Sequence, residues 1–358
     1  MWLLLVLAVG GIALEAQMPP VLNPNNIYSE TTPGKFKPGV QRYPSRIYIP
    51  HTRDNTVWVY DPAQKLIVEK FKVGKGRNVE PQHVVPSWDM TRIFATNDLN
   101  NTLAEIDPMT GKLMTIHRVA DPYNMYYTPD GKYMVVMAER LRRIDLRDPQ
   151  TLKLVKSIPV PCKGVNHADY SGDGKYLIAS CEFSAEILKI DMVKFEVLGS
   201  IALEKGAMPQ DTRVGPDGKT FYIADMMTHG MHVVDGDSFK IIEFIATGKG
   251  CHGLYPSRDT KQLYITNRGE GTISIMDFAT RKLVGRWTIP NGGSPDMGGV
   301  SADGKMFWVS GRYHHEIYGF DTTTGTLTER IKVGRGPHGL CVFPQPGRYS
   351  LGHTGNYR

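Results

Sequence analysis

The chain has 358 residues, of which 41% are hydrophobic and 22% charged, a composition typical of a globular protein with one large domain or two small ones. The net charge is +6, but the basic residues are spread along the chain and form no block. We therefore interpret the charge as a solvated surface and expect no nucleic-acid partner.

The first 16 residues, MWLLLVLAVGGIALEA, form an apolar run that ends in small residues. The run is short for a membrane span and fits the hydrophobic region of a signal peptide cleaved near Ala16. No Lys or Arg precedes it, so an uncleaved membrane anchor is the alternative, and this segment is the one contact with a membrane that we expect. The pattern predicts a periplasmic or secreted protein. Residues 17–44 are rich in Pro, Asn, Thr and Gly and predict an extended lead-in.

A short apolar strand that ends in Asp recurs along the rest of the chain. Its copies are VWVYD61, LAEID107, LRRID145, ILKID191, MHVVD235, ISIMD277 and IYGFD321. Their successive spacings of 46, 38, 46, 44, 42 and 44 residues match the blade period of four-stranded propeller repeats, about 40–45 residues. Each Asp-ended strand follows another apolar strand, and several of these follow an Asp-Gly-Lys turn suited to a tight hairpin. We expect each terminal Asp to cap the turn that follows it.

Each repeat therefore predicts four antiparallel strands, A to D from the inside outwards, and the seven copies predict an all-β, seven-bladed β-propeller over residues 45–345. Blade 1 has no strand A before Arg46, whereas an unpaired strand, HGLCVF at 338–343, follows the last repeat. We expect this C-terminal strand to join the N-terminal blade and close the ring, which removes two open sheet edges. Residues 346–358 are expected to form a tail on the closure blade.

The four cysteines, Cys162, Cys181, Cys251 and Cys341, form neither a CxxC nor a CxxCH motif. A covalently attached haem and a cysteine zinc cluster therefore have no motif here. Cys162 and Cys181 are both expected at one end of blade 4, where a disulfide is an alternative to buried free thiols.

The links that lead from strand D of one blade to strand A of the next deliver polar residues to one mouth of the central channel. Aligning these links gives two adjacent rows: Gln82, Tyr123, Asn166, Gln210, His252, Asp296 and His338, and His83, Asn124, His167, Asp211, Gly253, Met297 and Gly339. The B–C loops add Arg268 and Arg312 at the same face. Convergent polar groups in a concavity predict a binding site.

The candidate ligand-binding residues are His83, His167, Asp211, His252, Asp296, His338, Arg268 and Arg312. Imidazole and carboxylate groups suit zinc, copper or iron, so His83, His167, His252 and His338 are the candidate metal ligands. The alternative is structural, with these side chains filling a wet channel and bonding to exposed backbone.

The phrases VGRGPHGL, VSADGKMFWVSG, LYITNRGEGTISIMD and TPDGKYMVVM resemble the YVTN-type β-propeller repeats of exported bacterial and archaeal proteins. The resemblance covers about residues 45–345 and extends to the propeller domain of periplasmic cytochrome nitrite reductases and their haem-biogenesis relatives. It implies a modified haem over the channel mouth with an axial histidine, for which His83, His167, His252 and His338 are the candidates by position. The CxxCH module of those reductases is lacking.

Three functions remain open. The first is a non-catalytic exported propeller that binds a small ligand or a protein partner at the mouth face, with a subunit of a redox complex as one such case. The second is a redox protein that binds haem or a transition metal. The third is a lactonase-like or lyase-like enzyme with His, Glu and Arg at the mouth. Because no complete catalytic motif is present, the sequence favours the first.

Overall fold

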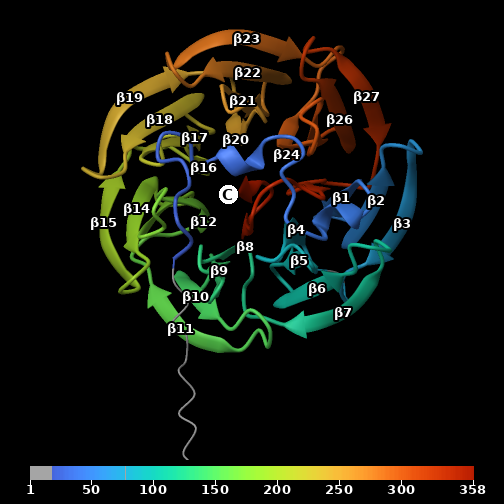
Figure 1. Ribbon diagram of the computed structural model, residues 1–358, viewed down its shortest axis with the longest axis horizontal. Helices are drawn as coiled ribbons and strands as arrows, with labels where there is room; N and C mark the ends of the chain where they lie inside the picture. The colour runs from blue at the N-terminus through green and yellow to red at the C-terminus, as the bar shows by residue number, and fades with distance from the viewer. Residues whose placement is uncertain (1–17, 77) are drawn as a thin grey trace, which may run out of the picture.

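Seven four-stranded antiparallel blades surround a central channel (Figure 1). The computed structural model describes residues 18–76 and 78–358, so the predicted signal peptide lies outside the described residues. Within them, helical structure is confined to the 3-10 turns η1 (Ser29–Thr31) and η2 (Val40–Arg42), and no helix is long and apolar enough to cross a membrane. The all-β seven-bladed propeller predicted from the repeat is confirmed.

Blades are numbered along the chain from Arg46, and the strands of each blade are given from the channel outwards. Blade 1 contains β28 (Cys341–Phe343), β1 (Arg46–His51), β2 (Thr56–Asp61) and β3 (Leu66–Lys72). Blade 2 contains β4 (Pro81–Pro86), β5 (Ile93–Asn97), β6 (Thr102–Ile106) and β7 (Leu113–Arg118). Blade 3 contains β8 (Asn124–Tyr127), β9 (Met134–Ala138), β10 (Arg143–Arg147) and β11 (Leu154–Pro159).

Blades 4 to 7 follow the same order. Blade 4 contains β12 (Val165–Tyr170), β13 (Tyr176–Cys181), β14 (Glu186–Asp191) and β15 (Glu196–Ala202). Blade 5 contains β16 (Pro209–Val214), β17 (Thr220–Asp225), β18 (Gly230–Asp235) and β19 (Lys240–Ala246). Blade 6 contains β20 (Cys251–Pro256), β21 (Gln262–Asn267), β22 (Thr272–Asp277) and β23 (Lys282–Thr288), and blade 7 contains β24 (Pro295–Val300), β25 (Met306–Gly311), β26 (Glu316–Asp321) and β27 (Leu327–Lys332).

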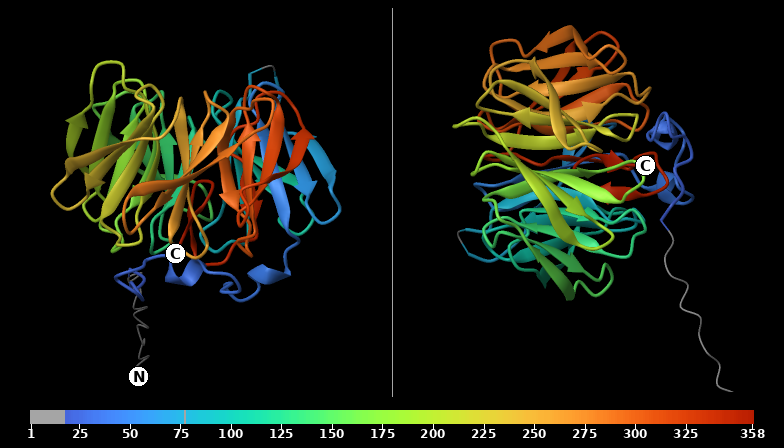
Figure 2. Two further views of the ribbon diagram at one scale, coloured as in Figure 1. Left: turned by 90° about the horizontal axis from the view of Figure 1, so that it is seen from above. Right: turned by 90° about the vertical axis from the view of Figure 1, so that its left-hand side faces the viewer.

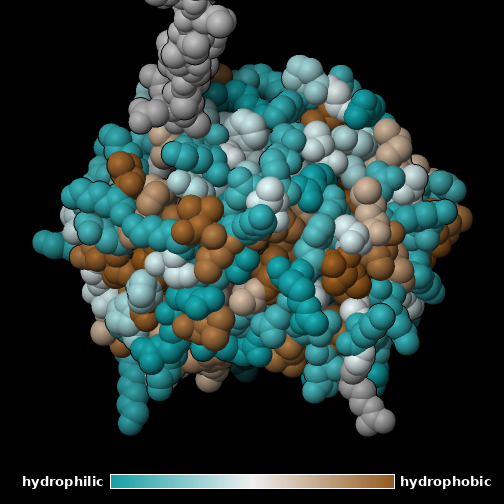
Figure 3. Space-filling model, turned by 90° about the horizontal axis from the view of Figure 1, so that it is seen from below, coloured by the Kyte–Doolittle hydropathy of each residue, from teal (hydrophilic) through white to brown (hydrophobic). Residues whose placement is uncertain are grey.

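Burial of side chains changes from the inner strands to the outer ones. Every residue of β12 and β16 is buried, whereas β15 and β27 alternate between half-buried and exposed positions. This alternation is expected of a strand with one face on the protein and one in solvent. In Figure 3 the outer wall shows brown apolar patches scattered among hydrophilic side chains, so single exposed apolar residues there need no special explanation.

The Asp residues that end most C strands cap the following turn, as predicted. The Asp61 carboxylate accepts backbone hydrogen bonds from Ala63 at 2.9 Å and Gln64 at 3.0 Å. In blade 3 the prediction that Asp145 ends its strand and caps the following turn is wrong. Asp145 lies inside β10, where its carboxylate accepts a hydrogen bond from Ser157, and the capping carboxylate there is Asp148, which accepts from the backbone of Thr151 at 2.6 Å.

The ring closes where the sequence predicts, because β28 pairs antiparallel with β1. Further contacts join the last link to blade 1: the Thr52 backbone N–H donates to Gly336 at 3.0 Å, and the Arg335 guanidinium lies 2.7 Å from Asp54. His51 also takes part, since its Nε2 accepts a hydrogen bond from the backbone N–H of Gly334 at 3.1 Å.

The predicted position of the C-terminal tail on the closure blade is wrong. Strand β29 (Ser350–Gly352) pairs instead with β8, and β30 (Asn356–Tyr357) pairs with β29, so that blade 3 becomes a six-stranded sheet. Gly352 explains this choice: it has a φ of +90°, and a Cβ there would lie 2.6 Å from the Met125 carbonyl and the Tyr126 Cα. Glycine thus allows the close approach to β8.

The lead-in and the tail lie together on the face of the ring opposite to the predicted mouth (Figure 2). The Ile27 backbone N–H donates to Pro216 at 2.8 Å, and the Tyr28 hydroxyl donates to the Val214 carbonyl at 2.6 Å. The Arg358 guanidinium stacks 4.7 Å from the Tyr28 ring centre. This face of the channel is therefore covered by chain segments that belong to no repeat.

Cys162 and Cys181 form a disulfide with a Cα–Cα distance of 6.1 Å, so the expectation of free thiols there is wrong. The bond joins the link before β12 to the end of β13, at the end of blade 4 where both were predicted. Cys251 and Cys341 are buried free thiols.

Candidate metal centre in the channel

Five of the predicted site residues lie in β-bulges of the inner strands: His83, His167, Asp211, His252 and Asp296. In blades 2 and 4 to 7 the innermost strand has a bulge directly after its first residue. The bulged residues are Gln82 and His83, Asn166 and His167, Gln210 and Asp211, His252 and Gly253, and Asp296 and Met297. A bulge sets two residues opposite one and redirects a side chain. This is why the cluster takes residues from both predicted rows.

The six predicted His and Asp residues are buried, at most 2% exposed. The sequence led us to expect these side chains around an open mouth. Instead they fill the channel centre beneath the mouth face. Arg268 is 8% exposed and the Arg312 side chain 23%. These two arginines lie nearer to solvent.

Five imidazole rings meet at the channel centre. The ring of His83 lies 4.8 Å from that of His338, 5.2 Å from that of His167 and 5.3 Å from that of His353. The His252 ring lies 6.0 Å from that of His338. The structure thus brings together all four histidines predicted from the sequence.

His353 was missed by the sequence prediction. It lies at the tip of the C-terminal hairpin, outside the repeats, so no repeat register assigned it to the channel. The hairpin inserts it between blades 3 and 5, where its Nδ1 lies 2.9 Å from the Asn124 amide nitrogen and its Nε2 lies 3.2 Å from the Asp211 carboxylate. The glycines on either side, in LGHTGNYR, were the available signal for a tight turn.

Several ring nitrogens of the cluster are buried without a hydrogen-bond partner. These are Nδ1 and Nε2 of His83, Nε2 of His167, Nδ1 of His252 and Nε2 of His338. Buried polar atoms are normally paired, and each exception requires an explanation.

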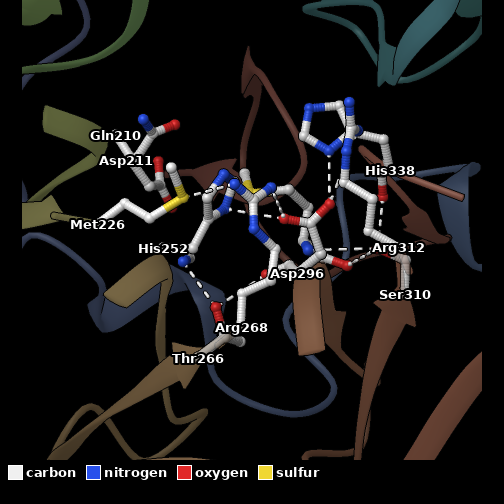
Figure 4. A network of polar contacts seen from close by, with 12 residues as sticks. Gln210, Asp211, Met226, His252, Thr266, Arg268, Asp296, Ser310, Arg312 and His338 are labelled. Atoms are coloured by element: carbon white, nitrogen blue, oxygen red, sulfur yellow. Dashed lines mark hydrogen bonds and ion pairs between the residues drawn. The ribbon is translucent and has the colours of Figure 1, made fainter. Parts of the chain in front are cut away.

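Asp296 organises one side of the cluster (Figure 4). Its carboxylate lies 2.7 Å from His338 Nδ1, 3.1 Å from His252 Nδ1 and 2.9 Å from the Arg268 guanidinium. Arg312 lies further away, at 3.8 Å. A carboxylate at Nδ1 orients an imidazole and leaves Nε2 free, as in many metal sites. The two predicted arginines thus contact Asp296 and balance its charge.

Asp211 organises the other side. Ligand atoms of His167, Asp211 and His353 all lie within 4.8 Å of one another, the one such metal-compatible group found among the described residues. The Asn124 amide nitrogen lies at Nδ1 of both rings, 3.2 Å from His167 and 2.9 Å from His353. An amide nitrogen donates, so both Nδ1 atoms accept and the proton of each neutral ring lies on Nε2, where a bound ion would replace it. The Nε2 of His353 also lies 3.4 Å from the Thr354 hydroxyl.

Burial keeps four of the imidazoles neutral by lowering their pKa, those of His83, His167, His252 and His338, whereas the two Asp carboxylates stay charged. Burial lowers the pKa of His167 to about 3, and burial together with neighbouring histidines holds the pKa of His83 well below its usual value. Burial opposes ionisation of Asp211, but His353 and Arg213 outweigh it and lower its pKa to about 2. Neutral imidazole and ionised carboxylate are the forms that bind metals.

A haem does not fit between these rings. The imidazole centres of His83, His167, His338 and His353 lie about one ring width apart, at 4.8–5.3 Å, which leaves no room for a porphyrin among them. A single metal ion requires only that ligand atoms converge.

The model of the YNCE-like beta-propellers matches residues 40–348 of the chain. Antigen Lp49 of Leptospira interrogans serogroup Icterohaemorrhagiae serovar copenhageni (strain Fiocruz L1-130) is 25% identical over an alignment of 162 residues, and the match covers 39% of this chain and 35% of that protein. The chain thus spans about a third of the length of this relative.

Two solved structures have the same fold. Hydrazine synthase of Kuenenia stuttgartiensis aligns with a TM-score of 0.63 and 20% identity over 74% of this chain and 89% of that one. Dihydro-heme d1 dehydrogenase NirN, in complex with DHE, aligns with a TM-score of 0.62 and 14% identity over 87% of this chain and 78% of that one. At such identities the likeness concerns the fold alone.

Proposed function

The chain belongs to the YNCE-like β-propeller family, and we propose that in this member the channel centre binds a transition-metal ion. The observation that carries this proposal is the set of buried ring nitrogens of His83, His167 and His338 that have no partner. A bound ion would satisfy lone pairs that no protein group satisfies.

The chemistry of the donors supports the same proposal. Imidazole and carboxylate groups suit zinc, copper, iron and nickel. The Asp296 carboxylate lies 2.7 Å from Nδ1 of His338, as outer-shell carboxylates do around known metal ligands.

Equilibrium dialysis of chelator-treated protein against Zn(II), Cu(II) or Ni(II), followed by elemental analysis, tests the proposal. We expect one of these ions to be retained at about one equivalent. His167→Ala should lower the affinity about 100-fold or more, because it removes a ligand from the centre.

The matched control is His314→Ala, since His314 is an exposed histidine in a loop of the same face. It should leave the affinity unchanged. Wild-type protein that retains none of the three metals above the level of the His167→Ala variant would contradict the proposal.

A second candidate function is docking of an acidic protein at the mouth face. The B–C loops of blades 2, 3, 4, 5 and 7 expose apolar side chains by 39% to 61%: Leu99, Leu141, Phe183, Met227 and Tyr313. The D–A links of the same face expose Lys75, Lys163, Lys205, Lys249 and Arg335. An apolar patch with basic residues around it suits a partner of opposite charge.

Size-exclusion chromatography of extracts from the protein's native compartment tests this docking. Wild-type protein should elute in a particle larger than a monomer, and elution should shift towards the monomer at high salt. Replacing Leu141, Phe183, Met227 and Tyr313 with Ser should abolish the larger particle. Monomeric wild-type protein in low-salt extract would contradict it.

We assign this function to the periplasm or the extracellular space. The apolar first 16 residues and the Cys162–Cys181 disulfide support export, because disulfides persist in oxidising compartments. Cell fractionation with detection of the mature N-terminus tests this assignment, and protein recovered with the cytoplasmic fraction would contradict it.

A further inference from the structure

The C-terminal hairpin, residues 350–357, is the one wall of the histidine cluster that belongs to no repeat. It enters the channel from the face covered by the lead-in and is buried along its length. Its backbone pairs with β8 at Gly352 and Tyr126, and beyond it the Arg358 guanidinium lies 2.9 Å from Asp169. Its tip presents His353 to the propeller.

The contacts of His353 connect this tip to two blades. Its Nε2 faces Asp211 of blade 5 at 3.2 Å, and its ring lies 5.0 Å from that of His167 of blade 4. The ligand atoms of these three residues converge within 4.8 Å. On the other side of the cluster, His338 Nδ1 is hydrogen-bonded to Asp296, and His252 Nδ1 lies 3.1 Å from the same carboxylate.

From this geometry we propose that His167, Asp211 and His353 hold the metal ion, so that the C-terminal hairpin supplies one ligand and completes the site only when it is seated. This inference rests on the proposed metal binding and specifies its ligands. Two imidazoles and one carboxylate form a set used for zinc and for non-haem iron. The ring centre of His83, whose two nitrogens lack partners, lies 5.2 Å from that of His167 and 5.3 Å from that of His353.

Seating of the hairpin and metal binding are then coupled. An ion that bridges the hairpin to blades 4 and 5 stabilises the seated state over any state in which residues 350–357 have left the channel. Departure of the hairpin also offers the buried site an entry path.

Titration with Co(II), followed by its visible ligand-field absorption, tests the ligand set. His353→Ala should lower the Co(II) affinity about 100-fold or more, and His167→Ala should do the same. His232→Ala is the matched control, because it removes a buried imidazole of blade 5 that contacts Asp225 and lies outside the cluster. It should change the affinity less than about threefold.

A second variant tests the coupling without removing a ligand. Gly352→Val places a side chain against the backbone of Met125 and Tyr126, so it should unseat β29 and weaken Co(II) binding although all three ligands are present. In wild-type protein, saturating Zn(II) should slow hydrogen exchange of residues 350–357 at least about fivefold.

The outcomes separate the two proposals. If His353→Ala binds Co(II) like wild type while His167→Ala does not, or if Zn(II) leaves hydrogen exchange of the hairpin unchanged, the inference is overturned and metal binding stands. If wild-type protein binds neither Co(II) nor Zn(II), both the proposed metal binding and the inferred ligand set are contradicted.

Discussion

His51 at the ring closure and His83 at the channel centre are both fully buried histidines with a lowered pKa, yet their surroundings differ. His51 Nε2 accepts a hydrogen bond from Gly334, and its Nδ1 lies 3.3 Å from the Thr56 hydroxyl. Neither ring nitrogen of His83 has a partner. Burial alone therefore does not distinguish a structural histidine from a candidate ligand, whereas the hydrogen bonds of the ring nitrogens do.

The largest expected effect is on stability. His51→Ala should lower the free energy of unfolding by about 3 kcal/mol, because it leaves a cavity and an unpaired buried N–H at Gly334. His83→Ala should cost about 1 kcal/mol or less, since it also removes two unsatisfied polar atoms. Urea unfolding in the presence of a chelator measures both. Equal losses would remove the distinction between the two sites.

Acidification should act on the closure through His51, whose pKa is lowered by burial from 6.5 to about 4. Between these pH values the unfolded chain binds a proton that the folded chain does not. The contribution of neutral His51 to the free energy of unfolding is therefore complete above pH 6.5 and is lost as the pH falls towards 4. His51→Gln should lessen this loss by about 2 kcal/mol. Unfolding curves from pH 7 to 4 measure it, and an unchanged slope would contradict a buried neutral imidazole.

The smallest effect compares the two carboxylates of the cluster. Asp296→Asn should reduce metal affinity about threefold or less, because Asp296 orients His252 and His338, which lie outside the proposed ligands. Asp211→Asn should reduce it by about 10-fold or more. Competition with a chromophoric chelator measures both affinities. A larger loss for Asp296→Asn would move the ion to the other side of the cluster.

The propeller could be predicted because its signals are local: Asp-Gly turns, alternating strands and capping Asp residues recur in each blade. The four histidines of the links could be placed at one end of the channel for the same reason. Their convergence in a buried layer could not be predicted, since the bulges that redirect His83 and Asp211 leave no mark in the sequence. His353 reaches the channel because Gly352 permits close packing on β8 and Arg358 pairs with Asp169, and these contacts depend on the folded ring.

Anomalous diffraction from crystals grown with Zn(II) tests the central claim most directly. We predict a zinc peak at the channel centre, about 2.0–2.1 Å from imidazole nitrogens of His167 and His353 and about 2.0–2.2 Å from the Asp211 carboxylate. Five ordered imidazoles with no anomalous peak among them, at a Zn(II) concentration that occupies surface sites of the same crystal, would contradict metal binding by this propeller.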